Sequence, residues 1–523
     1  MDRLLYELFT STTHCHPNSK ALESLTDSLT YAELLVKVDT LAEILEHNGV
    51  KRNDGRFQHC IGLISAQTVS TYSAYLAIIA CNAIVVPISP TAPLKRTEVV
   101  VASAHISWVL GDGPRPESLP SDCAYWDLST PFPAGLNLVG KYGAFPSDGC
   151  NLAYILFTSG TTGDPKGVPI SSRNLRAFLD DGVSFLDLAE GQRFSQTFDL
   201  TFDLSLFGML ACWSTGATLI LPAPWELASP VDYVRDRNLT HWFSVPSAIA
   251  LARNTKNFAP DTMPSLCWSL FCGESLTFED AIKWAKAATN SRVANLYGPT
   301  ETTISCTRYI LPEKVEDWPK TSNDTVPLGD AHPLSEIWIL ADNPLFPEGE
   351  LCVRGAQRFN GYLDDAQNEL RFLSLQKNLS QDKLTRLPKS DSWYRTGDRV
   401  RIEGELLVHI GRLDDQVKIQ GFRVELSDVR AVLLRNRHVH NAAVVSRKAT
   451  CGIGSIQIEA VVIANSLSLE ELNIWLQDEL PWYMVPEKII FVSHLPLNSN
   501  GKINATAVLE LISESDQYNI ENI

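Results

Sequence analysis

The segment from Leu152 to Pro169, LAYILFTSGTTGDPKGVP, constrains the fold more than any other part of the sequence. A run of apolar residues ends at Phe157, and residues 158–167 are then Thr, Ser, Gly, Asp, Pro and Lys alone. The apolar run predicts a buried strand, and the glycines after it allow the backbone to approach a ligand closely. Backbone N–H groups, hydroxyls and the ammonium of Lys166 suit an anion, so the segment predicts a phosphate-binding loop after a strand.

This loop differs from the common P-loop pattern. That pattern places a lysine directly before Ser or Thr at the start of a helix. Here Lys166 stands between Pro165 and Gly167. A surface loop rich in turn-forming residues therefore remains an alternative at this point, because the same residue types are common in turns.

The size and charge of the chain narrow the classes of protein that are possible. Its 523 residues favour two or more domains. A formal net charge of -17 disfavours nucleic acid or an anionic membrane as a partner, because phosphate binding needs excess Lys and Arg. The eleven cysteines form no C-x-x-C pair, which predicts reduced thiols in a cytoplasmic protein. The uncharged stretch 61–94 contains prolines and polar residues that a membrane span would avoid.

Short apolar runs alternate with helical patterns over the first 310 or so residues, which predicts an α/β fold with a largely parallel sheet. From about 326 to 410, short strand patterns between Gly and Pro turns predict a small β-rich subdomain. We expect a large N-terminal domain (1–411) that includes this subdomain. A smaller, mobile α+β C-terminal domain (412–523) is expected to follow it.

A second chemical pattern is NLYGPTETT, residues 295–303. A predicted strand ends at Tyr297, a Gly-Pro turn follows, and then hydroxyls and the carboxylate of Glu301 occur together. An aromatic ring can stack on a base, a threonine can bond a phosphate, and one carboxylate with phosphates can hold Mg²⁺. A turn with a capping glutamate would also explain this segment.

Six segments in the same order resemble the signature motifs of the adenylate-forming enzymes. This family contains acyl-CoA synthetases, luciferases and the adenylation domains of nonribosomal peptide synthesis. The segments are 158–167, 295–303, GELCVRG (349–355), YRTGD (394–398), GRLDDQVKIQGFRVE (411–425) and LPLNSNGKI (495–503). One such motif would be weak evidence, but six in order are specific. The resemblance implies a ligase that uses ATP and Mg²⁺ to form an acyl-adenylate and pyrophosphate.

The resemblance also implies an ATP site. Tyr297 is expected to stack on adenine, Asp398 to bind both ribose hydroxyls, and Arg412 to contact a phosphate or the ribose. Thr300 and Glu301 are expected to be catalytic, Thr300 at the α-phosphate and Glu301 as the Mg²⁺ ligand. The expected ATP-binding residues are Thr158, Ser159, Gly160, Thr161, Thr162, Gly163, Lys166, Gly273, Glu274, Asn295, Tyr297, Gly298, Asp398 and Arg412.

The last two motifs imply a catalytic lysine and a hinge. By resemblance, Lys502 bridges the attacking carboxylate and the α-phosphate, although a lysine after Asn-Gly would otherwise be a solvated turn residue. Asp414 is expected to be the hinge at which the C-terminal domain rotates between two half-reactions. Lys418 and Gly421 are expected on the face used in the second, thioester-forming step.

The segment TFDLTFDLSLF, residues 197–207, bears on the substrate. It resembles the segment of the peptide-synthesis branch whose aspartate pairs with the substrate α-ammonium, and Asp203 occupies that position. Alternatively, Asp203 caps a helix that begins near Ser205. The expected pocket residues are Asp203, Leu204, Phe207, Ser244, Leu270, Cys272, Leu296, Ile304 and Ser305. Apart from Asp203 and Lys502 the pocket carries no charge, which argues against a charged substrate side chain because that charge would be unpaired.

The doubled FDLTFDLS resembles freestanding L-prolyl-AMP ligases, so L-proline is the first candidate, followed by Ala, Val and Leu. Only residues 503–523 follow Lys502, so a separate phosphopantetheinyl carrier protein is expected to supply the thiol, with CoA as the alternative acceptor. Two further hypotheses remain open: an acyl-CoA or aryl-CoA ligase of the same fold, and a non-catalytic ATP-binding protein. The protein is expected to be monomeric.

Overall fold

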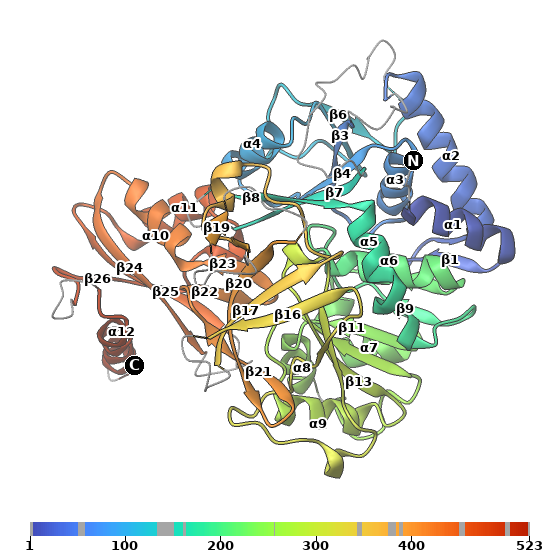
Figure 1. The fold of residues 1–523 in the computed structure, drawn as a ribbon. Helices are drawn as coiled ribbons and strands as arrows, with labels where there is room; N and C mark the ends of the chain where they lie inside the picture. Colours follow the sequence, from blue (N-terminus) through green and yellow to red (C-terminus); the bar gives the residue numbers. More distant parts are fainter. Residues whose placement is uncertain are drawn as a thin grey trace. The chain divides into compact units, whose positions relative to one another are not determined.

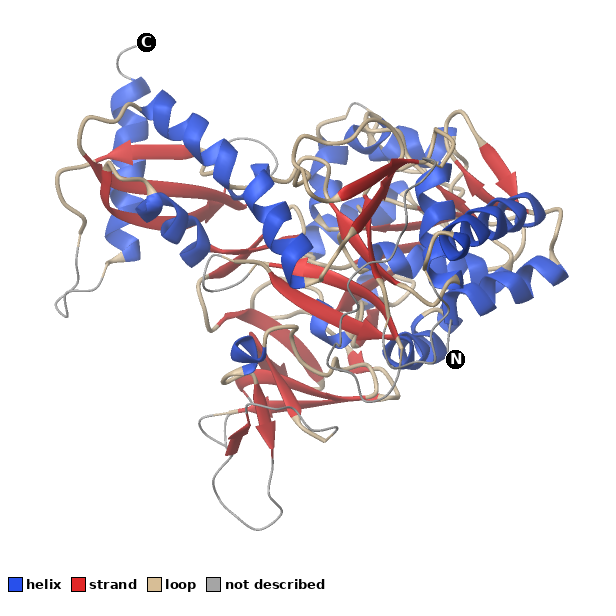
Figure 2. Cartoon of the chain, turned by 90° about the horizontal axis from the view of Figure 1, so that it is seen from above, coloured by secondary structure: helices blue, strands red, loops and turns tan. Residues whose placement is uncertain are grey.

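The fold is seen in a computed structural model (Figures 1 and 2). It describes residues 4–50, 58–132, 151–159, 164–255, 257–341, 348–374, 383–385, 391–448, 456–496 and 503–520. The chain forms two compact units. Unit 1 comprises Met1–Pro90, Val100–Phe157 and Lys166–Leu413, and unit 2 comprises Thr91–Val99, Thr158–Pro165 and Asp414–Ile523.

The largest sheet of unit 1 has nine described strands in the order β15-β14-β13-β12-β11-β9-β10-β1-β2. In that order they are Asp330–Ala331, Thr307–Ile310, Arg292–Tyr297, Trp268–Phe271, His241–Ser244, Arg193–Ser195, Thr218–Ile220, Lys20–Glu23 and Ser28–Thr30. The six strands from β13 to β1 are parallel to one another, whereas β14, β15 and β2 pair antiparallel. Because parallel strands end at the same edge, the loops after β11, β12 and β13 lie near one another.

A second sheet of unit 1 runs in the order β6-β5-β3-β4-β7-β8. Its strands are Ala124–Asp127, Trp108–Gly111, Cys60–Ile64, Ile84–Ile88, Leu152–Thr158 and Lys166–Ser171. The first five residues of β7 are buried, as expected of a central parallel strand. The apolar run before Thr158 is thus a strand, as predicted, and the strand β8 begins already at Lys166.

Helices cover these sheets, and together they confirm the predicted α/β class. Those of unit 1 are α1 (Leu4–Cys15), α2 (Tyr31–His47), α3 (Val69–Ala80), α5 (Ser172–Gly182), α6 (Leu204–Thr215), α7 (Pro230–Asp236), α8 (Ser247–Arg253) and α9 (Phe278–Ala287), and α4 (Leu94–Ser103) spans both units. α1 packs against α2, α3, α5 and α6. The first ten residues of α6 are all buried, which is typical of a helix that is apolar on every side.

The predicted β-rich region forms a third sheet in unit 1, in the order β16-β17-β20-β18-β19, with β21 paired to β20. These strands are Ser335–Leu340, Glu348–Gly355, Trp393–Glu403, Phe372–Ser374, Lys383–Thr385 and Leu406–Arg412. The neighbouring strands of this sheet pair antiparallel. Short 3-10 helices occur at Ser184–Leu186, Glu226–Ala228, Thr300–Thr302, Val315–Asp317, Asp365–Asn368 and Trp482–Met484.

Unit 2 contains a hairpin and a small sheet with helices. The hairpin is β22 (Gln416–Ile419) with β23 (Phe422–Glu425), and the sheet is β24 (Val439–Lys448), β25 (Ile456–Ala464) and β26 (Lys488–Phe491). Its helices are α10 (Leu426–Arg435), α11 (Leu469–Glu479) and α12 (Ala505–Ile520). Among all helices that the structure describes, none is both long and apolar enough to cross a membrane.

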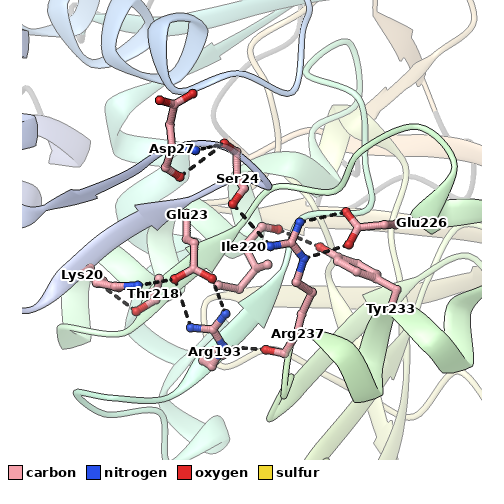
Figure 3. A network of polar contacts seen from close by, with 10 residues as sticks. All are labelled: Lys20, Glu23, Ser24, Asp27, Arg193, Thr218, Ile220, Glu226, Tyr233 and Arg237. Atoms are coloured by element: carbon pink, nitrogen blue, oxygen red, sulfur yellow. Dashed lines mark hydrogen bonds and ion pairs between the residues drawn. The ribbon is translucent and has the colours of Figure 1, made fainter.

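A polar network joins β1 to its neighbours in the largest sheet (Figure 3). Nη2 of Arg193 donates to Oε1 of Glu23 at 2.6 Å, and its Nε donates to the backbone oxygen of Arg237 at 2.6 Å. Arg237 in turn pairs with Glu226 at 2.7 Å. These side chains are largely buried, so their charge-assisted hydrogen bonds are stronger than those of surface ion pairs.

Candidate active site

Asp203 precedes α6, and it is almost completely buried. Its side chain makes no cap hydrogen bond to the helix, so the alternative interpretation of Asp203 as a helix cap is wrong. Instead Oδ2 accepts a hydrogen bond from the amide N–H of Ile304 at 3.0 Å. Burial raises the pKa of Asp203 to about 7; the Ile304 hydrogen bond opposes this rise, and the charge of Glu301 adds to it.

The loop that supplies this amide has an uncommon backbone. Thr303 and Ile304 have φ angles of 61° and 69°, in the left-handed region that β-branched residues rarely adopt. The loop also packs closely on Gly298, because a Cβ added there would lie 2.6 Å from the Cα of Ser305. The backbone at Ser305 therefore leaves no room for a side chain at position 298. The packing of the protein alone explains this glycine, without a bound ligand.

Most of the expected pocket residues share one hydrophobic core. These are Leu204, Phe207, Leu270, Cys272, Leu296 and Ile304. The register of β12 and β13 pairs Leu270 with Ala294, which puts Leu270 and Leu296 on one face of the sheet. Phe243 pairs with Leu270 on this face, and its ring lies 4.8 Å from that of Phe207. The sequence did not indicate Phe243, because a Ser244 that faced the pocket would place Phe243 on the opposite face of the strand.

The side chain of Ser244 points to the other face. It pairs with Phe271, one residue out of phase with Leu270. Its Oγ accepts a hydrogen bond from Nε1 of Trp242 at 2.8 Å, and Trp242 belongs to a second core. Ser305 is fully buried, and its Oγ has no hydrogen-bond partner among the described residues.

Glu301 lies in the 3-10 helix Thr300–Thr302 and is fully buried. The hydroxyl of Tyr362 donates to its Oε1 at 2.6 Å and lies 3.1 Å from the hydroxyl of Tyr394. Nζ of Lys166 lies 5.9 Å from the centroid of the Tyr362 ring. Tyr362 thus neighbours two of the expected site residues. No role for Tyr362 or Tyr394 was predictable from the sequence, because their contacts join residues that are distant along the chain.

The donor set at Glu301 suits one kind of metal site. Within the described part of the chain, no three His, Cys, Asp or Glu side chains are grouped so that they could hold a metal ion. Mg²⁺ commonly binds through one or two carboxylates and takes phosphates and waters as its other ligands. Glu301 therefore fits Mg²⁺ bound together with a nucleotide, and an all-protein metal cage does not fit.

Asp398 bonds to two other expected ATP-site residues, Tyr297 and Arg412. The hydroxyl of Tyr297 donates to Oδ2 at 2.6 Å, and Nη1 of Arg412 donates to Oδ1 at 2.9 Å. Nε2 of His409 also lies 3.3 Å from Oδ1. Burial, together with the charge of Asp398, raises the pKa of Tyr297 well above its usual range, so Tyr297 remains a proton donor.

Two other expected ATP-site side chains bond to backbone. Nδ2 of Asn295 donates to the carbonyl oxygens of Val326 at 3.3 Å and Pro327 at 2.9 Å. Oε2 of Glu274 accepts a hydrogen bond from the amide N–H of Ser247 at 2.9 Å. Gly273 has a φ of +93°, which favours glycine.

The remaining expected residues belong to unit 2. Oγ of Ser159 donates to the carbonyl oxygen of Arg423 at 2.7 Å. Lys418 pairs with Arg423 across the hairpin β22–β23. Gln420 and Gly421 form its two-residue turn with φ angles of 49° and 84°, the signs of a type I′ turn. Gly421 therefore has a local structural reason to be glycine.

Several expected residues cannot be placed. Gly160, Thr161, Thr162, Gly163 and Lys502 lie outside the described residues. Thr158 is the last residue of β7, and Asp414 is the first residue of the long segment of unit 2.

A large α/β unit followed by a small α+β region, with these motifs in order, defines an adenylate-forming ligase. The chain belongs to the AMP-binding enzyme family: the AMP-binding enzyme model matches residues 9–363, and the model of the AMP-binding enzyme C-terminal domain matches residues 428–502. The predicted family is thereby confirmed.

The chain is similar over nearly its whole length to curated relatives. It is 29% identical to an L-proline--[L-prolyl-carrier protein] ligase of Pseudomonas fluorescens, over 97% of this chain and 99% of that protein. It is 26% identical to a D-alanine--D-alanyl carrier protein ligase of Bacillus velezensis, over 94% of this chain and 96% of the relative. Among solved structures, the Vibrio cholerae adenylation domain AlmE has a TM-score of 0.80 at 23% identity and 98% coverage of both chains, which establishes the shared fold.

Proposed function

We propose that the protein activates an α-amino acid with ATP and transfers it to the phosphopantetheine thiol of a separate carrier protein. L-Proline is the first candidate for the amino acid. The observation that carries this proposal is the carboxylate of Asp203, which is buried beside an apolar core and has a pKa raised to about 7.

A fixed positive charge would be stabilised by this carboxylate. An ionised carboxylate that is buried without a cation is costly, so an α-ammonium at Asp203 would relieve a penalty that the free protein bears. A fatty or aryl acid carries no such cation and would leave the penalty in place. Asp203 thus favours an amino acid over the acids used by acyl-CoA and aryl-CoA ligases.

The surroundings of Asp203 support a small apolar substrate side chain. The expected pocket residues Leu204, Phe207, Leu270, Leu296 and Ile304 belong to one hydrophobic core, and a charged side chain among them would lack a partner. The L-proline ligase of Pseudomonas fluorescens supports L-proline, whereas the D-alanine ligase of Bacillus velezensis supports a smaller residue. A difference of one methylene changes binding by only about 1–3 kcal/mol, so other small amino acids are expected to react more slowly.

In the first step, a carboxylate oxygen of the amino acid attacks the α-phosphorus of ATP, and the bond to the departing pyrophosphate breaks. Lys502 is placed by its motif to hold the attacking carboxylate and the α-phosphate together, and Thr300 donates to the same phosphate. Lys166 holds the β- and γ-phosphates. Mg²⁺ bound at Glu301 would neutralise phosphate charge as it builds.

The nucleoside is held by a separate cluster. Tyr297 offers its ring to the adenine, and Asp398 accepts hydrogen bonds from the ribose hydroxyls, as an ionised carboxylate can. Arg412 forms an ion pair with Asp398 and would contact the ribose or a phosphate. These residues position ATP without taking part in bond making.

In the second step, the thiol sulfur attacks the carbonyl carbon of the aminoacyl-AMP. The bond between this carbon and the phosphate oxygen breaks, AMP leaves, and a thioester is formed. Rotation at Asp414 would withdraw Lys502 and present the face that carries Lys418 and Gly421 to the incoming thiol. A carrier protein is preferred to CoA because carrier-protein ligases occur among the relatives matched over their full length.

The test is ATP–PPi exchange with the proteinogenic amino acids, L-proline first, against a panel of fatty and aryl acids. Exchange with a small apolar amino acid is the expected result. Exchange with non-amino acids alone would reject the role of Asp203 and favour an acyl-CoA ligase. Loss of exchange in Lys502→Ala with ATP binding retained would exclude a non-catalytic ATP-binding protein, and an unchanged rate would refute the role of the lysine.

A further inference from the structure

We propose that Gln357 is a positioning residue for the amino-acid pocket. It fixes the loop Thr302–Ser305 and thereby the amide of Ile304 that donates to Asp203. This inference rests on the proposed function, because it assumes that Asp203 receives the substrate ammonium. Gln357 lies just outside the six segments quoted above, and it lies far along the chain from both Asp203 and Ile304.

Gln357 bonds to the loop through its side chain and its backbone. It follows β17 and is fully buried. Its Nε2 donates to the carbonyl oxygen of Ser305 at 2.7 Å and lies 3.3 Å and 3.4 Å from those of Thr302 and Thr303. Its own carbonyl oxygen accepts a hydrogen bond from Oγ1 of Thr303 at 2.6 Å. Every residue from Thr302 to Ser305 except Ile304 therefore contacts Gln357 directly.

The orientation of the Gln357 amide is determined by its neighbours. Oε1 accepts a hydrogen bond from Oγ of Ser335 at 3.1 Å and lies 3.2 Å from Nδ1 of His332. Burial, together with the charge of Arg308, lowers the pKa of His332 to about 4, so its imidazole is neutral and can donate from Nδ1. The opposite orientation would place Oε1 against three carbonyl oxygens. Both ends of the amide are thus used.

The loop needs such an anchor because its backbone is strained. Two consecutive β-branched residues, Thr303 and Ile304, have positive φ, and such conformations persist only where the surroundings impose them. If the hydrogen bonds of Gln357 were lost, the loop would relax toward ordinary φ values. The amide of Ile304 would then turn away from Asp203, and the side chain of Ile304 would leave its place in the core that lines the pocket.

The test compares Gln357→Met with the wild type in ATP–PPi exchange, using L-proline or whichever proteinogenic amino acid the wild type exchanges fastest. We expect the KM of the amino acid to rise about tenfold, the effect of a few lost hydrogen bonds, while the KM of ATP stays within about twofold. Thr303→Val removes only the bond to the Gln357 backbone and should give a smaller rise of the same kind. This second variant keeps the test available if Gln357→Met folds poorly.

Gln58→Met is the matched control. Gln58 is also buried and bonds to backbone, with Nε2 donating to Asn82 at 3.2 Å and Leu152 at 3.0 Å. Its loss should lower the melting temperature and leave the KM of the amino acid unchanged. An unchanged amino-acid KM in Gln357→Met and Thr303→Val, or an equal rise in both KM values, would overturn the positioning role. A wild type that exchanges no amino acid would instead reject the proposed function.

Discussion

The amide N–H of Ile304 lies 3.0 Å from Oδ2 of Asp203, and this contact joins the start of a buried helix to a strained loop. The hydrogen bond stabilises the ionised carboxylate, yet burial outweighs it and leaves the pKa of Asp203 near 7. At neutral pH the group is therefore close to half-ionised. A bound cation would complete its ionisation, so the charge of Asp203 depends on pH and would respond to the ammonium of the proposed substrate.

Asp203→Asn should stabilise the protein in a pH-dependent way. Because the folded pKa is about 7 against an ordinary 3.8, the native carboxyl retains a proton that the unfolded chain has lost, and stability falls as pH rises through this window. The substitution removes that penalty, so we expect a gain in the free energy of unfolding of about 4 kcal/mol at pH 8 and less than about 1 kcal/mol at pH 4. Thermal denaturation at both pH values measures it. An equal effect at both would contradict the assignment.

The same variant should lose amino-acid exchange, since Asn cannot neutralise an ammonium. In the wild type, kcat/KM for the amino acid should rise with pH as Asp203 ionises, with an apparent pKa near 7. The residual kcat/KM of the variant should not rise with pH in this range. The measurement is exchange from pH 5.5 to 8.5, and a wild-type profile without an inflection in that range would count against Asp203.

Glu301→Gln tests the metal site. The amide retains a contact with Tyr362 but loses the charge that suits Mg²⁺, so exchange should fall at least about 100-fold at fixed Mg²⁺, since metal stabilisation of phosphate charge is worth several kcal/mol. The Mg²⁺ concentration for half-maximal rate should also rise. Glu336→Gln is the control, because Glu336 is an exposed carboxylate paired with Arg354 at 2.6 Å. A similar loss in both variants would refute a specific role for Glu301.

Glu23→Gln tests the polar network of Figure 3. Burial alone would raise the pKa of Glu23. The hydrogen bonds from Arg193 and Lys20 outweigh this effect and lower the pKa to about 2. Its stabilising effect is therefore fully present above the ordinary value of 4.5 and is lost as pH falls toward 2. We expect the variant to lose about 2 kcal/mol of stability at pH 7 and much less at pH 3. Urea unfolding of both proteins at the two pH values measures the difference in stability. A loss of stability that is as large at pH 3 as at pH 7 would contradict this role of Glu23.

Gly298→Ala tests the close approach of backbone to backbone. The added Cβ would meet the Cα of Ser305 at 2.6 Å, so the loop must shift and exchange should fall together with stability. Gly208→Ala is the control within α6, where side-chain atoms of Leu219 and Phe194 would lie nearest to the new Cβ, at 3.0 Å and 3.4 Å. Alanine also favours helix over glycine by about 1 kcal/mol, which offsets that crowding. Melting temperatures and exchange rates of the two variants should differ clearly.

The sequence predicted the features that depend on neighbouring residues. The apolar run that ends at Phe157 is the buried strand β7, and the ordered motifs identified the family. The face of Ser244 was not predictable, because it depends on the register of β11 against β12. Tyr362 and Gln357 were missed for a similar reason, since their partners are distant in sequence and only the folded chain brings them together.

The cap interpretation of Asp203 shows a further limit. An aspartate just before a helix is an ordinary capping residue, and local pattern alone cannot distinguish capping from burial. In the folded chain the carboxylate bonds instead to Ile304 of a remote loop. Only the tertiary structure reveals the competing partner.

Side chains along β11, β12 and β13 alternate between the two faces of the sheet, so mutations on the two faces have different consequences. Leu270 and Leu296 enter one core, which contains most of the expected pocket residues, while Trp242, Phe271 and Val293 enter a second core on the other face of the sheet. Under the proposed function, a mutation on the first face would alter which substrate is accepted while the second face continues to hold the sheet to its helices. A lineage could therefore exchange one amino acid for another by small steps without passing through an unfolded ancestor.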